Sequence, residues 1–206
     1  MALPSFSSRF IHRSLQSVVA IVLVAGIVLG SIGVVVNAAL ALVVTTLPTV
    51  LRRDYDIYLS PVLSLWIAGA VALHAVGMVV LYDHVWWWDH LTHFVSAALV
   101  AGVGYALTVT LDEHSDAIHF PQSFLTVYIF LVTVAAGVFW ELLEMLGREL
   151  ARTYGFEAVL VVYGLEDTML DLIFDMFGAA VVALVGGDSL REFVRLPTAW
   201  SQHERR

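Results

Sequence analysis

The chain has 206 residues, of which 60% are hydrophobic and 14% charged, and its mean hydropathy is +0.86. About a quarter of the residues of a soluble domain are charged, so this composition indicates an integral membrane protein. The lack of cysteine excludes disulfides, zinc–thiolate sites and iron–sulfur clusters, and a net charge of −8 without any lysine argues against nucleic-acid binding.

Long apolar runs predict an all-α fold, a polytopic transmembrane helical bundle that forms one integral membrane domain over residues 1–206. The first run, from Ser14 to Pro48, would make a single helix about 50 Å long, against a hydrocarbon core of about 30 Å. We therefore expect the glycine-containing stretch 30–33 to divide it into two helices. About six spans are predicted, at residues 14–29, 33–51, 59–82, 89–110, 122–147 and 165–187.

The arginines orient this predicted bundle. With six spans and a cytoplasmic N-terminus, eight of the ten arginines lie on the cytoplasmic side, which satisfies the positive-inside rule. If the first apolar run were one span, only six of the ten would lie there. We therefore predict a multi-pass protein of the cytoplasmic membrane with both termini in the cytoplasm. The eight arginines are Arg9, Arg13, Arg52, Arg53, Arg191, Arg195, Arg205 and Arg206.

Three polar stretches interrupt the last three predicted spans. Because successive spans alternate in direction, all three stretches fall in the outer halves of their helices, at similar depth. An ionised side chain in a bilayer is costly unless it is paired, hydrated or bound to a cation, so we expect these groups to face one another. The stretches contain Asp89, His90 and His93 in the fourth span, Glu141 and Glu144 in the fifth, and Asp167, Asp171 and Asp175 in the sixth.

Helical spacing places the members of each stretch on one face of their helix. His90 and His93 are three residues apart, and so are Glu141 and Glu144. The aspartates of the sixth span are spaced by four residues and form a single stripe, in which Asp175 lies about 12 Å deeper than the first aspartate. Contact with lipid would be prohibitive at that depth, so the stripe is expected to face the interior of the bundle.

Two imidazoles among six carboxylates form an oxygen and nitrogen ligand set that suits Mg²⁺, Mn²⁺, Fe²⁺ or Zn²⁺. Crowded carboxylates repel one another, and a bound cation is one remedy. Protonation is another, in which case the same groups would only hydrogen-bond neighbouring helices. The candidate metal ligands are Asp89, His90, His93, Glu141, Glu144, Asp167 and Asp171, and the candidate catalytic carboxylates are Glu144 and Asp175.

Other polar and aromatic residues near these spans are given structural interpretations. His74, alone in the third span, is expected to be a hydrogen-bonded core histidine, and Asn37 is expected to bond a neighbouring helix. The tryptophans at 86–88 are typical of an aromatic belt at the membrane interface. Asp83 and His84 lie in the loop before the fourth span and could reach the site from outside.

The three motifs resemble those of the YjdF-like family of small prokaryotic inner-membrane proteins. The resemblance covers residues 30–187 and implies an inner-membrane location, but this family has no settled activity. The motifs are Trp88-Asp89-His90-Leu91-Thr92-His93-Phe94, Trp140-Glu141-Leu142-Leu143-Glu144, Asp167-Thr168-Met169-Leu170-Asp171 and the following Asp175-Met176-Phe177-Gly178-Ala179.

The chain is also similar, more distantly, to the VanZ-like family, whose members are associated with glycopeptide resistance. That family pairs an Asp-x-x-x-His-Phe helix start with a later Glu and an Asp-x-x-x-Asn-x-x-Gly helix. The segment from Asp89 to Phe94 fits the helix start, and Gly178 matches the final glycine. Asp175 stands where the pattern has Asn, and this departure weakens the implication of a VanZ-type role.

Three functions are compatible with these observations. The first is a metal-dependent enzyme that acts on lipid or lipid-linked headgroups at the outer leaflet, with a spare carboxylate as general base. The second is a proton- or cation-coupled transporter in which the aspartate stripe forms a relay. The third is a non-catalytic membrane partner protein whose polar cluster fixes helix packing. Membrane lipids are the expected partners, and the substrate and oligomeric state stay open.

Overall fold

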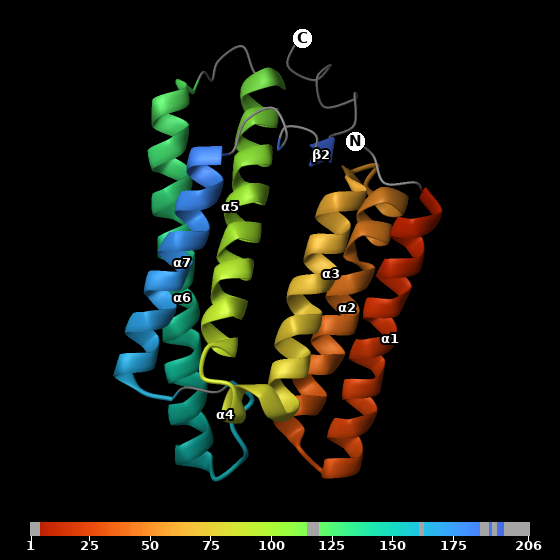
Figure 1. Ribbon diagram of the computed structural model, residues 1–206, viewed down its shortest axis with the longest axis vertical. Coiled ribbons are helices and arrows are strands. Elements are labelled where there is room, and N and C mark those ends of the chain that lie inside the picture. Colours follow the sequence, from red (N-terminus) through yellow and green to blue (C-terminus); the bar gives the residue numbers. More distant parts are fainter. Residues whose placement is uncertain (1–4, 115–119, 161–162, 186–189, 191–192, 196–206) are drawn as a thin grey trace.

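The computed structural model describes residues 5–114, 120–160, 163–185, 190 and 193–195. Long helices dominate these residues and run alternately up and down the molecule (Figure 1), which confirms the all-α class. The one strand pair is minimal, since β1 (Tyr58–Leu59) and β2 (Val194–Arg195) have two residues each. The helices are α1 (Ser5–Leu29), α2 (Ile32–Asp54), α3 (Pro61–Val76), the π-helical turn η1 (Gly77–Leu81), α4 (Tyr82–His84), α5 (Trp88–His114), α6 (Gln122–Tyr154) and α7 (Leu165–Val185).

Most of the predicted spans coincide with helices that have the length and composition to cross a membrane. α7 is as long as a span, but its carboxylates set it apart from the others by composition. It packs against α5 and α6, so its neighbours support its membrane location. Among the described residues, the five segments that are apolar enough are Ser8–Leu29, Ile32–Asp54, Pro61–His84, Trp88–Asp112 and Ser123–Tyr154.

The first apolar run is two helices, as predicted. α1 ends at Leu29, and Gly30 turns the chain with a φ of 70°, a left-handed conformation that a side chain would disfavour. Ser31 then caps α2, because its Oγ accepts a hydrogen bond from the backbone N of Val34 at 3.4 Å. A glycine turn followed by a serine cap thus converts one run into a helical hairpin.

Two helices extend beyond the predicted bounds. α1 begins at Ser5 rather than at residue 14, and α6 continues to Tyr154 rather than ending at residue 147. α6 ends where Gly155 adopts a φ of 72°, the usual left-handed position after a helix. The predicted spans are shorter than these two helices, because a helix can continue into the polar zone past the membrane. Residues 186 and 187 of the sixth predicted span lie outside the described residues.

The arginines separate toward the two ends of the molecule. Arg9 belongs to the start of α1 and Arg53 to the end of α2, and these two ends lie together (Figure 1). Arg148 and Arg152 belong to the last turns of α6, at the opposite end. This separation agrees with the charge pattern used to orient the bundle, although the side that faces the cytoplasm stays a prediction. Arg191, Arg205 and Arg206 lie outside the described residues.

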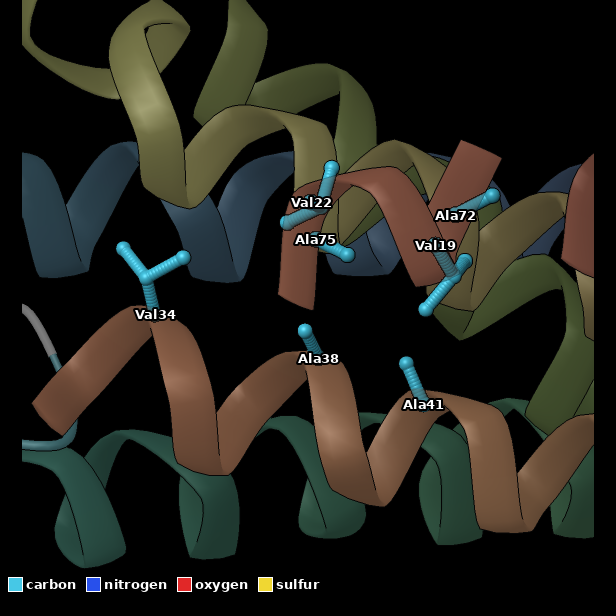
Figure 2. Packing of buried hydrophobic residues seen from close by; sticks show 7 residues of the cluster. All are labelled: Val19, Val22, Val34, Ala38, Ala41, Ala72 and Ala75. Carbon is cyan, nitrogen blue, oxygen red and sulfur yellow. The ribbon is translucent and has the colours of Figure 1, made fainter. Parts of the chain in front are cut away.

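Contacts between the long helices divide the fold into two bundles (Figure 1). In the first bundle, α1–α3, the core consists of alanine and valine side chains that let the helices approach closely (Figure 2). In the second bundle, α5–α7, close approach depends on glycine. A Cβ at Gly178 of α7 would lie 2.5 Å from the carbonyl oxygen of Phe94 and 2.9 Å from the backbone N of Ala98 on α5. The first-bundle core residues are Val19, Val22, Val34, Ala38, Ala41, Ala72 and Ala75.

The π-helical turn η1 joins the bundles at the end that carries the polar cluster. π-Turns are rare and often occur at functional positions. At its first residue, Gly77, an added Cβ would lie 2.7 Å from Tyr82 Cζ and 2.9 Å from Trp88 Nε1. Glycine therefore lets both aromatic rings pack against the end of α3, and this packing places Tyr82 beside the polar cluster.

Candidate functional site

The three polar stretches meet at one end of the second bundle. The start of α5, the second half of α6 and the start of α7 lie at the same level there (Figure 1). This placement agrees with the predicted common depth and with the inward-facing aspartate stripe. Asp89 and Asp167 are half-buried. The other six candidates are buried, and they are His90, His93, Glu141, Glu144, Asp171 and Asp175.

His90 pairs with a carboxylate of α7. Its Nδ1 lies 2.7 Å from Asp171 Oδ1, and both side chains are almost fully buried. The imidazole stacks on Phe174, with ring centroids 5.1 Å apart, and meets the edge of Trp86 at 6.1 Å. Asp167 adds a third ligand-type atom, since one atom from each of His90, Asp167 and Asp171 falls within 4.8 Å of the others. His90 is thus held rigidly by one hydrogen bond and two aromatic rings.

His93 stands at the centre of the remaining carboxylates. Its Nδ1 lies 3.3 Å from Asp175 Oδ1, on α7. Its Nε2 lies 3.7 Å from Glu141 Oε1, on α6, and 3.9 Å from Asp89 Oδ1, one turn back on α5. The two ring nitrogens therefore face different partners, with Asp175 on one side and Glu141 with Asp89 on the other.

Glu141 carries an unusual oxygen. Its Oε1 is buried and has no hydrogen-bond partner, the single such side-chain atom found among the described residues. Buried polar atoms almost always have a partner, so this carboxylate oxygen, which faces a histidine nitrogen, is a candidate ligand atom. Glu144 lies beside it and accepts a hydrogen bond from Trp140 Nε1 at 2.9 Å. Ligand-type atoms of His93, Glu141 and Glu144 fall within 4.8 Å of one another.

The candidates divide into overlapping groups rather than one set of seven ligands. Among the described residues, each group that could hold a cation contains one histidine. Asp171 is shared, because it belongs with His90 and Asp167 in one group and with His93 and Asp89 in another. The sequence predicted the shared location, whereas the division between the two histidines emerges only from the structure.

Asp175 depends on a glycine of α6 for its position. A Cβ at Gly137 would collide with Asp175 Oδ2 and would lie 3.0 Å from its Cγ. The missing side chain leaves room for the carboxylate between α6 and α7, on the side of His93 away from Glu141. Asp175 therefore lies where it can orient the imidazole.

A chain of hydrogen bonds links this cluster to the first bundle. Tyr82 Oη lies 2.7 Å from His74 Nδ1 and 3.3 Å from Thr92 Oγ1, while His74 Nε2 lies 3.1 Å from Asn37 Oδ1. Thr92 in turn donates to the carbonyl oxygen of Asp89 at 2.8 Å. The structural interpretations of His74 and Asn37 are confirmed, since both are hydrogen-bonded between helices.

Sequence reasoning missed the roles of Tyr82 and Thr92 in this chain. Thr92 lies one turn after Asp89, so its helical spacing was an available signal. Tyr82 offered no such signal, because its return to His74 depends on the π-helical turn between them.

The loop residues before α5 have unequal relations to the site. Asp83 Oδ1 accepts a hydrogen bond from Tyr163 Oη at 3.0 Å, and the backbone N of Tyr163 donates to Asp167 Oδ2 at 3.3 Å. Burial, followed by the bond to Asp83, raises the pKa of Tyr163, so this hydroxyl stays protonated. His84 instead bonds the carbonyl oxygen of Val80 in its own helical turn, at 2.8 Å. Asp83 thus reaches the margin of the site through Tyr163, and His84 is held locally.

A cavity of about 600 Å³ adjoins the cluster and lies between the two bundles. Its walls come mainly from α2 and α3 on one side and α5 and α6 on the other. Most lining residues are apolar, and polar groups gather where the cavity meets the cluster. They include Asn37, His74 and Tyr82 from one side, and Asp89, His93 and Glu144 from the other.

Comparison with known proteins places the chain in a family without an assigned activity. An uncharacterized protein from Thermotoga maritima is 29% identical over 123 residues, which are 59% of this chain and 59% of that protein. The chain therefore spans about three-fifths of the length of this relative. No solved structure matches the chain. The more distant VanZ-like resemblance stays a prediction.

A family model described as "Predicted membrane protein (DUF2238)" matches residues 11–191. This family is that of the YjdF-like proteins, so the first resemblance agrees with the match. The matched region contains both helical bundles and all eight residues of the polar cluster. The chain therefore belongs to the DUF2238 family of predicted membrane proteins.

Proposed function

We propose that the protein is a membrane enzyme that binds one divalent cation between His93 and Glu141 and acts on the headgroup of a lipid or lipid-linked substrate. The observation that carries this proposal is the buried, partnerless Oε1 of Glu141, which faces His93 Nε2 at 3.7 Å. Two ligands that each lie about 2.1 Å from a common metal are at most about 4.2 Å apart. The distance of 3.7 Å between His93 Nε2 and Glu141 Oε1 is within that limit.

The far side of His93 supports the same assignment. Histidines that bind a metal through one ring nitrogen usually give the other to a carboxylate, which fixes the tautomer and the orientation of the ring. Asp175 occupies this position, with its Oδ1 3.3 Å from His93 Nδ1. We therefore assign Asp175 to positioning rather than to catalysis.

The chemistry follows from the ligand set. A cation held by His93 and Glu141 would polarise a substrate phosphoryl or acyl oxygen and would lower the pKa of bound water. Glu144 adjoins the cation position and also lines the cavity, so it can accept the proton of an attacking water. Both roles need the substrate headgroup in the polar end of the cavity, where Asp89 and His93 are also accessible.

The arginine distribution supports a site on the outer side of the cytoplasmic membrane. The end with the cluster lies opposite the end with Arg9 and Arg53, and the positive-inside rule assigns that arginine-bearing end to the cytoplasm. In this orientation the substrate headgroup belongs to the outer leaflet.

A transport function has less support. The stripe of α7 does not form a free relay, because Asp171 is bonded to His90 and Asp175 to His93. Deeper in α5, Thr108 donates to the carbonyl oxygen of Gly104 in its own helix, at 2.7 Å. Carboxylates that are hydrogen-bonded to histidines favour a fixed binding site over a pathway that conducts protons.

The cation site is tested by metal content. The purified protein is loaded with Mn²⁺ or Zn²⁺, desalted and measured by elemental analysis, and about one ion per chain is expected. Glu141→Gln and His93→Ala should each abolish retention. Asp175→Asn should weaken affinity about 10- to 100-fold, the usual effect of changing a group that orients a metal ligand.

The matched control is Glu149→Gln, two turns further along α6, where Glu149 is exposed and pairs with Arg152. This variant should retain the ion fully. Failure of the unmodified protein to retain either metal, or retention by Glu141→Gln at the unmodified level, would overturn the proposal.

A further inference from the structure

The cavity between the bundles is amphipathic along its length. Its polar end adjoins the cluster, where Asp89 and Glu144 are exposed to it. Away from that end, the walls are apolar and come from Val44 of α2, Val71 of α3 and Leu99 of α5. A volume of about 600 Å³ falls within the range of about 300–1,000 Å³ that is usual for small-molecule sites. The cavity therefore suits a ligand with one polar end and an apolar body.

The depth of the cavity matches one leaflet of a membrane. Along α5 it extends from Asp89 to Val100, eleven positions that correspond to about 16 Å at the rise of an α-helix. Half of a hydrocarbon core of about 30 Å is about 15 Å. The polar end thus lies at headgroup level when the apolar end reaches the middle of the bilayer.

The cavity also has a lateral opening. Leu40 of α2 and Trp140 of α6 line it, yet 58% of Leu40 and 38% of Trp140 remain exposed. Both helices are long and apolar enough to cross a membrane. A ligand therefore has access from the hydrocarbon phase, between α2 and α6, without passing through water.

We infer that this cavity holds the apolar tail of a membrane lipid taken from the leaflet that faces the cluster, with its headgroup at His93 and Glu144. The inference rests on the proposed function and names its substrate class. A water-soluble substrate would gain nothing from the apolar walls, whereas a lipid keeps its tail in an apolar environment while its headgroup leaves the interface. The first bundle then has a defined role, since it forms half of the tail site.

Photolabelling tests this inference. The protein is reconstituted in vesicles of a phospholipid that carries a diazirine in one acyl chain, irradiated, and digested for mass spectrometry. Labels are expected on the half-buried cavity residues Val44, Val71 and Leu99. Ala136→Trp, which fills the cavity from α6, should abolish these labels. Ala135→Trp makes the same change at the neighbouring exposed position outside the cavity, and it should leave them intact.

A second pair of variants approaches from the opposite wall and keeps the test decisive if one variant does not fold. Leu40→Trp fills the cavity from α2, whereas Val43→Trp adds the same ring on an exposed face outside it. The inference is overturned if the unmodified protein carries no label at Val44, Val71 or Leu99, or if the cavity variants are labelled there as strongly as their controls.

Metal content separates this inference from the proposed function. Ala136→Trp should retain Mn²⁺ at the unmodified level, because Ala136 offers no ligand atom and lies more than one helical turn before Glu141 on α6. Loss of labelling with the metal retained supports the tail site. If Ala136→Trp retains the metal and is still labelled, the tail site alone is overturned. If the unmodified protein is labelled but retains no metal, the cation site alone is overturned.

Discussion

The two bundles share an architecture of three alternating helices, but among the described residues only the second adds a buried cluster of imidazoles and carboxylates to its apolar core. The first bundle is closed by small apolar side chains such as Val19, Ala38 and Ala75. The second buries imidazoles and carboxylates, among them His93, Glu141 and Asp175. In a membrane, apolar contacts between helices are only slightly better than contacts with lipid, so either core must be justified by packing or by hydrogen bonds.

This difference shows where specificity resides. The small side chains of the first bundle can be exchanged for others of similar volume, because packing tolerates such swaps. In the second bundle His90 is paired with Asp171 and His93 with Asp175, and the loss of one partner leaves the other buried and unsatisfied. We therefore expect comparable substitutions to have unequal effects in the two bundles.

The largest effect is expected for Asp171→Ala. This change removes the partner of His90 Nδ1, which is bonded at 2.7 Å and buried under Phe174 and Trp86. A buried group left without a partner costs about 1–3 kcal/mol, so the free energy of unfolding should fall by about that amount. Thermal unfolding in detergent measures it. Glu166→Ala, at an exposed position of the same helix, should change stability by less than about 0.5 kcal/mol.

If Asp171→Ala and Glu166→Ala were equally stable, the pair of His90 and Asp171 would contribute nothing measurable to the stability of the second bundle. Asp171→Asn sharpens the result, because the amide oxygen can still accept from His90. It should recover part of the lost stability.

Glycine-to-alanine changes compare the bundles directly. Gly137→Ala in α6 forces a Cβ against the carboxylate of Asp175, and overpacking of this kind costs about 1–3 kcal/mol. Gly69→Ala in α3 meets no other atom within 4 Å and adds a better helix former, so it should be neutral or stabilising by up to about 1 kcal/mol. Melting temperatures of both variants check this, and equal shifts would contradict the comparison.

The second bundle was largely predictable from the sequence, whereas its internal pairing was not. The cost of burying charge in a bilayer, together with the four-residue spacing, correctly placed Asp171 and Asp175 toward the interior. Periodicity gives the face of a helix but not the rotamer or the partner, so it left open that His90 would bond Asp171 and His93 would bond Asp175. These pairings depend on the position of α7 along its axis relative to α5.

The first bundle gave fewer sequence signals for function. Its helix break was predictable, because Gly30 and the following Ser31 are recognisable turn and cap residues. Its share of the cavity was not, since apolar residues such as Leu40 and Val44 have the same sequence pattern whether they face lipid, a core or a ligand. The hydrogen-bonded link through Tyr82 was equally unpredictable, because a π-helical turn changes which residues share a face of the helix.

A smaller effect is expected where the bundles are joined. Tyr82→Phe keeps the aromatic ring and removes the hydroxyl that bridges His74 and Thr92. Hydrogen bonds between membrane helices contribute about 0.6 kcal/mol on average and at most about 1.7, so the stability loss should lie in that range. A double-mutant cycle with Thr92→Val measures the coupling between Tyr82 and α5, and strictly additive effects would show that this bond does not hold the bundles together.

The smallest effect is expected at Glu157, in the connector after α6, which accepts hydrogen bonds from Ser31 Oγ at 2.6 Å and from the backbone N of Ile32 at 2.9 Å. These bonds, that of Ser31 first, lower the pKa of Glu157 below its ordinary value of 4.5. The carboxylate also lies at the N-terminus of α2, where a surface charge contributes about 0.3–1 kcal/mol, so Glu157→Gln should cost no more than about 1 kcal/mol at pH 7.

The pH dependence of that cost has a definite sign. Because the folded-state pKa of Glu157 is lowered, its contribution to stability is fully present above pH 4.5, declines as the pH falls through that value, and is lost below the folded-state pKa. Melting temperatures of the unmodified protein and Glu157→Gln should therefore differ at pH 7 and converge under acid conditions. If the difference in melting temperature persisted unchanged in acid, the charge of Glu157 would not hold the connector against α2. Packing alone would then join the bundles at this point.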